Sequence, residues 1–243
     1  GITGYEWRIE QVGDALCSVC ASDPSILMNR VLDHGSSAPP TADQLGDIRR
    51  VNADAGVGRF FLHVVPERKG RDTDDLLNAA GYEKYRGWMK FQRGAGAVRE
   101  STTDLDVRHV GLEHGDAFAA IVVPAFDMAP ASEPVVALLP GVANQTAFMS
   151  FDGDTPAGTG AVYIDGDVAA LDWGATRPGF RRRGGQTAVL AERIRFAFEQ
   201  GCETICTMTG EAVPGDPQHS YGNITKSGFA EAYRRENWIP ATP

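Results

Sequence analysis

The sequence predicts an α/β protein with a mixed sheet, of the α+β kind, and three observations support this. The apolar run Val168–Thr176 is typical of a strand, and it leads through a glycine turn into an amphipathic helix from about residue 187. Apolar and polar residues alternate over Ala157–Ile164, as in a half-buried strand. The first half of the chain shows a similar order of elements. Elements that alternate in this way build a sheet covered by helices.

Composition narrows the class of protein. The chain has 243 residues, 42% of them hydrophobic, which suffices for one large domain or two small ones with real cores. Its formal net charge of −9 argues against nucleic acid or an anionic membrane as a partner. No apolar run approaches a membrane span, and the first residues lack a signal-peptide pattern. We therefore expect a cytoplasmic protein.

The four cysteines do not predict a metal site. Cys17 and Cys20 are expected on a helix over residues 9–22, where the i, i+3 spacing suits packing. Cys202 and Cys206 have poor spacing for zinc, and no histidine pair accompanies either set. We expect reduced thiols and no bound metal.

The first half of the chain contains a helix, a strand and a second strand in clear order. Thr41 with Gln44 forms a capping-box pattern that predicts a helix start, and the helix ends near Gly56. A strand is expected over 59–65, and Gly81–Tyr82 opens the last strand. The stretch 93–104 is linker-like. The division predicts two lobes, residues 1–97 and 98–243.

The second lobe repeats this order after additional elements. Its expected strands and helices are a strand at 106–111, helical segments near 114–123 and 133–141, strands at 146–152, 157–164 and 168–176, a helix at 187–200, a strand at 203–209, a helix near 220–227 and a strand at 229–238. Internal duplication is the simplest account of the similarity between the lobes. Chance similarity of two α/β units remains the alternative.

Residues 177–187 predict an anion site. Four arginines, Arg177 and Arg181 to Arg183, surround the glycines Gly184 and Gly185 between the strand and the helix. Glycines allow close backbone approach, the helix N-terminus offers N–H groups, and the arginines add charge. The loop matches neither the P-loop nor the dinucleotide fingerprint. The alternative is a basic surface turn.

This loop resembles that of the GCN5-related N-acetyltransferases, the GNAT superfamily. Arg181-x-x-Gly184-x-Gln186, with Pro178 before it, fits the family signature except at Gln186, where the family has a small residue. The resemblance implies a GNAT fold with two GNAT-like lobes in tandem and acetyl-CoA as co-substrate. The first lobe would be degenerate, because residues 33–40 contain no arginine and have prolines, which lack N–H donors.

The resemblance also implies which residues bind the cofactor. Backbone amides of residues 181–187 would hold the pyrophosphate, the end of the preceding strand would face the pantetheine and acetyl carbonyl, and an asparagine would contact the cofactor arm. The implied residues are Gly174, Ala175, Thr176, Arg181, Arg182, Arg183, Gly184, Gly185, Gln186, Thr187 and Asn223.

Acyl transfer to an amine needs a base and a proton donor. Asp172, in apolar surroundings on the strand, is the first candidate for the base, and Glu211 is the second. The alternative for Asp172 is a structural, hydrogen-bonded side chain. The family's general-acid tyrosine falls at Ile224, and Tyr221 is the nearest substitute. Tyr221 could equally be a packed aromatic residue.

We therefore expect an acyl-CoA-dependent N-acyltransferase that acts by direct attack of a primary amine on the thioester, with acetyl-CoA as the first choice of donor. The acceptor would be a small molecule, and whether the chain forms a homodimer is left open. Two alternatives remain: an acyl-CoA-binding protein without catalysis, and a protein N-acetyltransferase.

Overall fold

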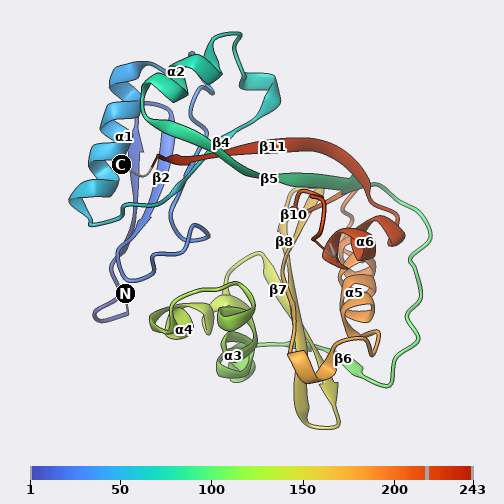
Figure 1. Ribbon diagram of the computed structural model, residues 1–243. Coiled ribbons are helices and arrows are strands. Elements are labelled where there is room, and N and C mark those ends of the chain that lie inside the picture. Colours follow the sequence, from blue (N-terminus) through green and yellow to red (C-terminus); the bar gives the residue numbers. More distant parts are fainter. Residues whose placement is uncertain (1, 217–218, 242–243) are drawn as a thin grey trace. The chain divides into compact units, whose positions relative to one another are not determined.

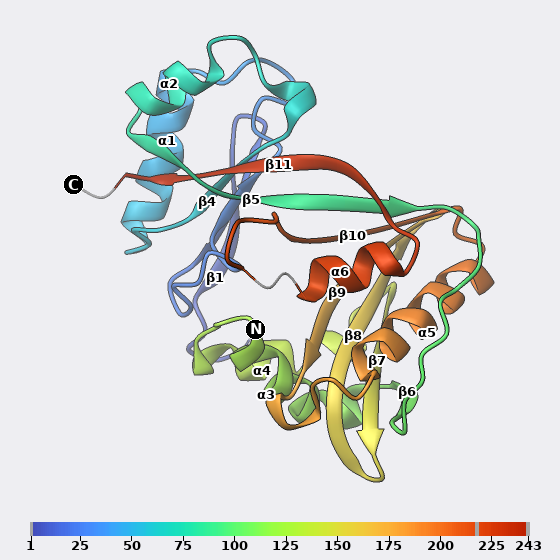
Figure 2. The ribbon, with the colours of Figure 1, turned by 45° about the vertical axis from the view of Figure 1, so that its right-hand side comes forward.

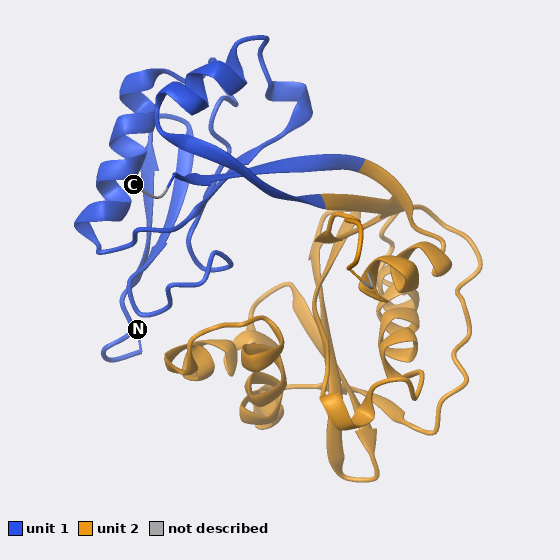
Figure 3. Cartoon of the chain, in the orientation of Figure 1, with its two compact units in different colours: residues 1–88, 233–243 blue, residues 89–232 orange. Residues whose placement is uncertain are grey.

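The computed structural model describes residues 2–216 and 219–241, which form two compact units. Unit 1 comprises residues 1–88 with 233–243, and unit 2 comprises residues 89–232 (Figure 3). The long strands β5 (Tyr82–Arg93) and β11 (Ala230–Pro240) each begin in one unit and end in the other. The predicted lobes, residues 1–97 and 98–243, concern an internal duplication of the sequence. The compact units are defined by contacts in the fold and do not test that duplication, so the lobes stay a prediction.

Unit 1 consists of a sheet with two helices. Its strands follow the order β1-β2-β3-β4-β11-β5, and β3 runs parallel to β4. The further elements of this unit are β1 (Trp7–Val12), β2 (Ala15–Cys20), β3 (Arg30–Leu32), α1 (Ala42–Asp54), β4 (Phe61–Val64), a 3-10 turn (Pro66–Arg68) and α2 (Thr73–Ala79). The core between α1 and the sheet contains Leu45, Ile48 and Leu62, all fully buried.

The helix predicted over residues 9–22 is wrong, because this segment forms the antiparallel β1–β2 hairpin. Gly13, with φ of 61°, makes the turn that a helix would not allow. Ala15, Cys17 and Val19 are buried and alternate with the less buried Leu16 and Ser18, which is the period of a strand. The four cysteines are free, and no metal-binding cluster occurs among the residues that the structure describes.

The helix start predicted at Thr41 is confirmed. The Thr41 hydroxyl accepts a hydrogen bond from the Gln44 N–H at 3.2 Å and so caps α1. The Gln44 side chain does not return to the cap but donates to Val12 and Asp14 of the hairpin. The Gln44 side chain therefore ties the start of α1 to the hairpin.

Unit 2 is built as the sequence predicts. Its elements are β6 (Asp106–Val110), α3 (Gly115–Ala125), α4 (Glu133–Val136), β7 (Gln145–Asp152), β8 (Thr155–Asp165), β9 (Val168–Thr176), α5 (Gly185–Glu199), β10 (Thr204–Gly210) and α6 (His219–Lys226), with 3-10 turns at Leu112–His114, Pro130–Ser132, Leu139–Gly141 and Pro178–Phe180. Only the helical segment expected at 133–141 is shorter, since the second half of it is a proline-containing turn.

The sheet of unit 2 is mixed, which confirms the predicted fold class. Its strand order is β5-β10-β9-β8-β7-β6, in which β10 and β9 are parallel and β6 to β9 pair antiparallel. Helices α5 and α6 lie on one face of the sheet, and α3 and α4 lie on the other (Figures 1 and 2). No described helix has the length and apolarity that a membrane crossing requires.

Candidate functional site

The candidate site begins where β9 runs into α5. Gly184 caps α5 with φ of 80°, and a Cβ atom there would lie 2.5 Å from the Thr102 carbonyl oxygen. A Cβ atom on Gly185 would lie 2.7 Å from the Leu105 side chain. Gly184 is therefore restricted to glycine by packing and by its left-handed backbone, whereas a side chain at Gly185 would require only the end of the Leu105 side chain to move.

The packing beneath the loop comes from the stretch that the sequence indicates as a linker. The Ser101 hydroxyl donates to the Gly184 carbonyl at 2.9 Å, and the Thr102 carbonyl lies against the same glycine. The stretch thus supports the loop as well as connecting β5 to β6. No sequence pattern marks this role.

The N-terminus of α5 presents the donors that an anion needs. The first intrahelical bond runs from the Ala188 N–H to the Gly184 carbonyl, so the N–H groups of Gly185, Gln186 and Thr187 precede it. A helix of 15 residues adds its dipole at this end. The arrangement favours a phosphate-like ligand.

The arginines of the loop divide into two kinds. Arg183 donates to Asp152 at 2.7 Å and to Asp104 at 3.2 Å, and these hydrogen bonds raise its pKa above the usual range. Arg177 donates to the Pro156 carbonyl at 3.2 Å. Both hold the loop in place.

Arg181 and Arg182 differ from these two. They are exposed, and neither guanidinium has a partner among the described residues. Arg181 and Arg182 are thus available for a ligand.

The strand before the loop is bent. Trp173 has φ of 58°, a left-handed conformation that is uncommon outside glycine, and the β8–β9 register shifts between Thr159 and Ala161. This shift is a β-bulge, and the Thr159 hydroxyl donates to the Trp173 carbonyl at 2.9 Å across it. Bulges of this kind re-aim backbone and side chains next to functional sites.

Strands β9 and β10 stay paired only over their first halves. Their register runs from Val168↔Thr204 to Leu171↔Thr207, while β9 continues to Thr176 and β10 to Gly210. The Thr207 hydroxyl donates to the Leu171 carbonyl at 2.9 Å and so closes the ladder. Beyond Leu171 the backbone of β9 is not paired with β10. This unpaired part of β9 includes Gly174, Ala175 and Thr176.

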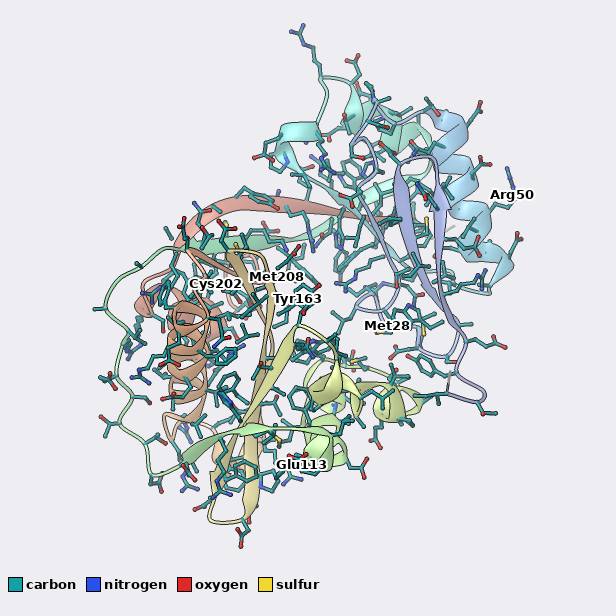
Figure 4. The ribbon with its side chains drawn as sticks, turned by 180° about the vertical axis from the view of Figure 1, so that it is seen from behind. Met28, Arg50, Glu113, Tyr163, Cys202 and Met208 are labelled. Carbon is teal, nitrogen blue, oxygen red and sulfur yellow. The ribbon has the colours of Figure 1, made fainter. Side chains whose placement is uncertain are left out.

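Asp172 lies at the start of this bend. It is half-buried, and its neighbour Leu171 belongs to the core beneath α5, so the Asp172 side chain points to the opposite face of the sheet. Cys206 and Met208 alternate with core residue Ile205 on β10 and share that face. Figure 4 marks Met208 together with Tyr163, which the register with Ala170 places on the same face.

Glu211 follows β10 directly, and its side chain is half-buried. It therefore comes after the part of β10 that extends beyond the ladder with β9. The sequence-predicted second base is thus placed at the open end of the two strands.

Tyr221 of α6 is held by other groups. Its hydroxyl donates to the Glu231 carboxylate, and its ring packs edge-on against Phe91 at 4.9 Å. Burial, together with the bond to Glu231 and its charge, raises the pKa of Tyr221 to about 12. Ile224, at the family's tyrosine position, is buried in the core of unit 2. Neither position thus presents a readily lost proton.

Asn223 and Gln186 are brought together. The Asn223 amide donates to the Gln186 side-chain oxygen at 3.0 Å, which links α6 to the first turn of α5. Gln186, which departs from the family signature, therefore contacts Asn223, which resembles the family's cofactor-binding asparagine.

Unit 1 also contains a glycine-containing loop between a strand and a helix. Between β3 and α1, the N–H groups of Gly35 and Ser37 donate to the Asp14 carboxylate at 3.3 and 2.8 Å, and both serine hydroxyls of this loop and Gln44 donate to it as well. Burial opposes ionisation, but these hydrogen bonds outweigh it and lower the pKa of Asp14 well below its usual range. The N–H groups of Gly35 and Ser37 are thus occupied by an internal carboxylate.

Comparison with known proteins finds a family model that is similar to part of the second unit. Residues 121–219 match the model described as the acetyltransferase (GNAT) family. No curated protein matches the sequence significantly.

Solved structures resemble the whole chain. A GCN5-related N-acetyltransferase from Kribbella flavida has a TM-score of 0.71 at 17% identity, with 98% of this chain and 91% of that chain covered. One from Sphaerobacter thermophilus has a TM-score of 0.66 at 11% identity, covering 93% and 80%. A tandem GNAT protein from the clavulanic acid biosynthesis pathway has a TM-score of 0.59 at 12% identity, covering 87% and 74%. At such identities these likenesses show the fold.

Proposed function

We propose that this chain, whose residues 121–219 match the acetyltransferase (GNAT) family model, is an enzyme of that family and transfers an acyl group from acyl-CoA to the primary amine of a small molecule. Acetyl-CoA is the donor that we propose first. The observation that carries the proposal is the continuous arrangement of the bent end of β9, the glycine-capped loop and the N-terminus of α5.

The residues present fit a coenzyme A ligand. The pyrophosphate would lie against the amides of residues 181–187, with Arg181 and Arg182 as free cations and Arg183 as a support of the loop. The Thr176 hydroxyl is buried and has no partner among the described residues, so it offers an unused group where the pantetheine would pass. Gly174 and Ala175 would supply backbone to the same arm.

The amine must lose a proton before it attacks. A primary amine with pKa near 10.4 is protonated at pH 7.4, and its deprotonation costs about 4 kcal/mol. We assign Asp172 as the base, because its carboxylate has no hydrogen-bond partner among the described residues and lies on the face away from α5. Glu211, beyond the end of β10, is the second choice.

Two further steps complete the transfer. N–H groups of β9 beyond Leu171 would stabilise the negative charge that forms on the thioester oxygen. When the tetrahedral intermediate collapses, the C–S bond breaks and the nitrogen loses its second proton, which reaches the leaving thiolate through water. Tyr221 could supply the thiolate's proton instead if Glu231 releases that hydroxyl. A thiol pKa near 8.5 means that the thiolate does not require a strong general acid.

A second function, acyl-CoA binding without catalysis, is favoured by one observation. The hydroxyl of Tyr221 is bonded to Glu231 and Ile224 is buried, so the described site offers no strong general acid. This alternative predicts CoA affinity but no acyl transfer.

Turnover with a panel of amines separates the two functions. The protein is mixed with acetyl-CoA and small amines, amino acids and lysine peptides, and acylated products are detected by mass spectrometry. We expect products from one class of small amine. Binding of CoA by calorimetry without any product would favour the binding protein, and preferential acylation of peptides would favour a protein acetyltransferase.

A further inference from the structure

A buried arginine lies behind the bend in β9. Arg193 of α5 is only 5% exposed, although α5 has surface positions that suit a cation better. Burial lowers the pKa of Arg193 to about 10, while the nearby charge of Asp172 opposes this effect, so the guanidinium stays protonated at neutral pH. The described hydrogen bonds of Arg193 run to carbonyl oxygens.

Those carbonyls belong to both strands of the bulge. Arg193 Nη1 donates to the Asp172 carbonyl at 3.0 Å on β9 and to the Ala161 carbonyl at 3.3 Å on β8. The same two residues face each other in the β8–β9 register, next to the point where the register shifts. Nε donates at 3.3 Å to the Val189 carbonyl one turn back on α5. The guanidinium thus joins the helix to the bend.

Gly160 makes room for this side chain. A Cβ atom on Gly160 would lie 2.7 Å from Arg193 Nε and 2.8 Å from its Cζ, whereas one on Gly174 would make an ordinary contact with Nη2 at 3.5 Å. Gly160 sits at the register shift of β8, and Gly174 follows Trp173 in the bend. The absence of a side chain at Gly160 of β8 therefore leaves the space that the guanidinium fills.

Stability alone does not account for a cation at this position. Apolar residues of similar size commonly replace buried charges without loss of stability, because desolvation offsets the interactions that the charge makes. The neighbours of Arg193 on the same helix face, Val189 and Ile194, are apolar core residues. The particular contribution of Arg193 is to hold two carbonyl groups at the bulge.

We propose that Arg193 is a positioning residue for acyl transfer: its guanidinium fixes the bend of β9 and so sets the direction of the N–H groups of residues 173–176 towards the acyl carbonyl. This inference rests on the proposed function, because it concerns the same end of β9. Arg193 touches no reacting atom in this scheme and acts through the backbone that it holds.

The experiment uses the full chain and four variants. Arg193→Met removes the donors at similar length, Arg193→Lys keeps the charge with a single point donor, and Gly160→Ala displaces the guanidinium without altering it. Arg195→Met is the matched control, because Arg195 lies on the same helix but pairs with Glu100 and Glu192 at the surface. The readouts are kcat, KM for acetyl-CoA, CoA affinity and amide hydrogen exchange at residues 173–176.

For Arg193→Met we expect a kcat lowered about 10- to 100-fold, with KM for acetyl-CoA and CoA affinity nearly unchanged. Exchange at residues 173–176 should become faster. Gly160→Ala should give the same pattern, Arg193→Lys an intermediate one, and Arg195→Met should match the unmodified protein. This split between kcat and KM would not follow from a general loss of stability.

Unchanged kcat in Arg193→Met, or unchanged exchange at residues 173–176 in both Arg193→Met and Gly160→Ala, would overturn the proposal. An equal loss in Arg195→Met would do the same. If Arg193→Met does not fold, Arg193→Lys and Gly160→Ala carry the test. If the unmodified protein shows no turnover with any amine, the proposed function fails, while the exchange measurements still decide whether Arg193 holds the bend.

Discussion

At the scale of single residues, the four arginines of the loop have different contacts and therefore different expected effects. Arg181 has no partner among the described residues, whereas Arg183 is held by Asp104 and Asp152. Arg181→Ala should weaken CoA binding about 10-fold, since a hydrogen bond to a charged group contributes about 1.5 kcal/mol. Calorimetry of CoA binding measures this loss.

Arg183→Ala serves as the comparison for that prediction. It should mainly loosen the loop, so its thermal stability should fall together with any loss of affinity. If Arg181→Ala binds CoA as tightly as the unmodified protein, the result would contradict the assignment of the phosphate site to residues 181–187.

The second prediction for a single residue concerns the role of the Asp172 carboxylate as the base. Asp172→Asn should lower kcat and change the pH dependence of turnover, because an amide cannot accept the proton of the amine. CoA affinity should stay nearly the same, since the side chain points away from α5. Steady-state kinetics across pH checks this, with Glu211→Gln as the comparison. A pH profile and rate equal to those of the unmodified protein would exclude Asp172 as the base.

At the scale of elements, the loop between β9 and α5 depends on Gly184. Gly184→Ala places a Cβ atom 2.5 Å from the Thr102 carbonyl and forces alanine into φ of 80°. The left-handed backbone alone costs about 1–2 kcal/mol. We expect a lower melting temperature and weaker CoA binding.

Gly179→Ala is the matched control within the same loop, because a Cβ atom there meets nothing within 4 Å and its φ is not positive. It should melt like the unmodified protein. Thermal unfolding followed by circular dichroism compares the two variants, and equal melting temperatures would contradict the packing seen beneath Gly184.

The corresponding loop of unit 1 gives a prediction about pH. The pKa of Asp14 is lower in the folded chain than in the unfolded one, so its ionised form stabilises the fold above the unfolded pKa, near 3.9. This stabilisation is lost as the pH falls towards the folded pKa. Asp14→Asn should be less stable at neutral pH and should lose less stability on acidification. Urea unfolding at pH 7 and pH 3 measures both differences, and an equal pH dependence in the two proteins would contradict the role of Asp14.

At the scale of the whole molecule, each unit has a loop that leads from a strand into a helix, and the two loops differ in what their N–H groups contact. Among the described residues, the N–H groups at the start of α5 and the guanidinium groups of Arg181 and Arg182 have no partner, whereas the loop of unit 1 is occupied by the Asp14 carboxylate. We therefore expect one CoA bound per chain. Calorimetric stoichiometry tests this number, and a value of two would show that the loop of unit 1 also accepts the cofactor.

Much of the architecture could be predicted from local patterns. The bounds of β9 agree with the sequence prediction, α1 and α5 begin within two residues of it, and the glycine loop lies between strand and helix as expected. Each of these signals lies within one short segment, where periodicity, caps and glycines directly reflect backbone conformation. The hairpin over residues 7–20 was missed because its alternation is short and contains cysteines that also suit a helix.

The sequence by itself therefore determined the order of elements in unit 2, the glycine loop and the family that this loop resembles. Only the tertiary structure decided which groups meet: Arg193 with the carbonyls of the bend, Asp14 with the loop of unit 1, Glu231 with Tyr221, and residues 101–105 beneath Gly184. These contacts join positions far apart in the chain. A local pattern records the conformation of its own segment, but it carries no information about which distant donor or carbonyl will be buried beside it.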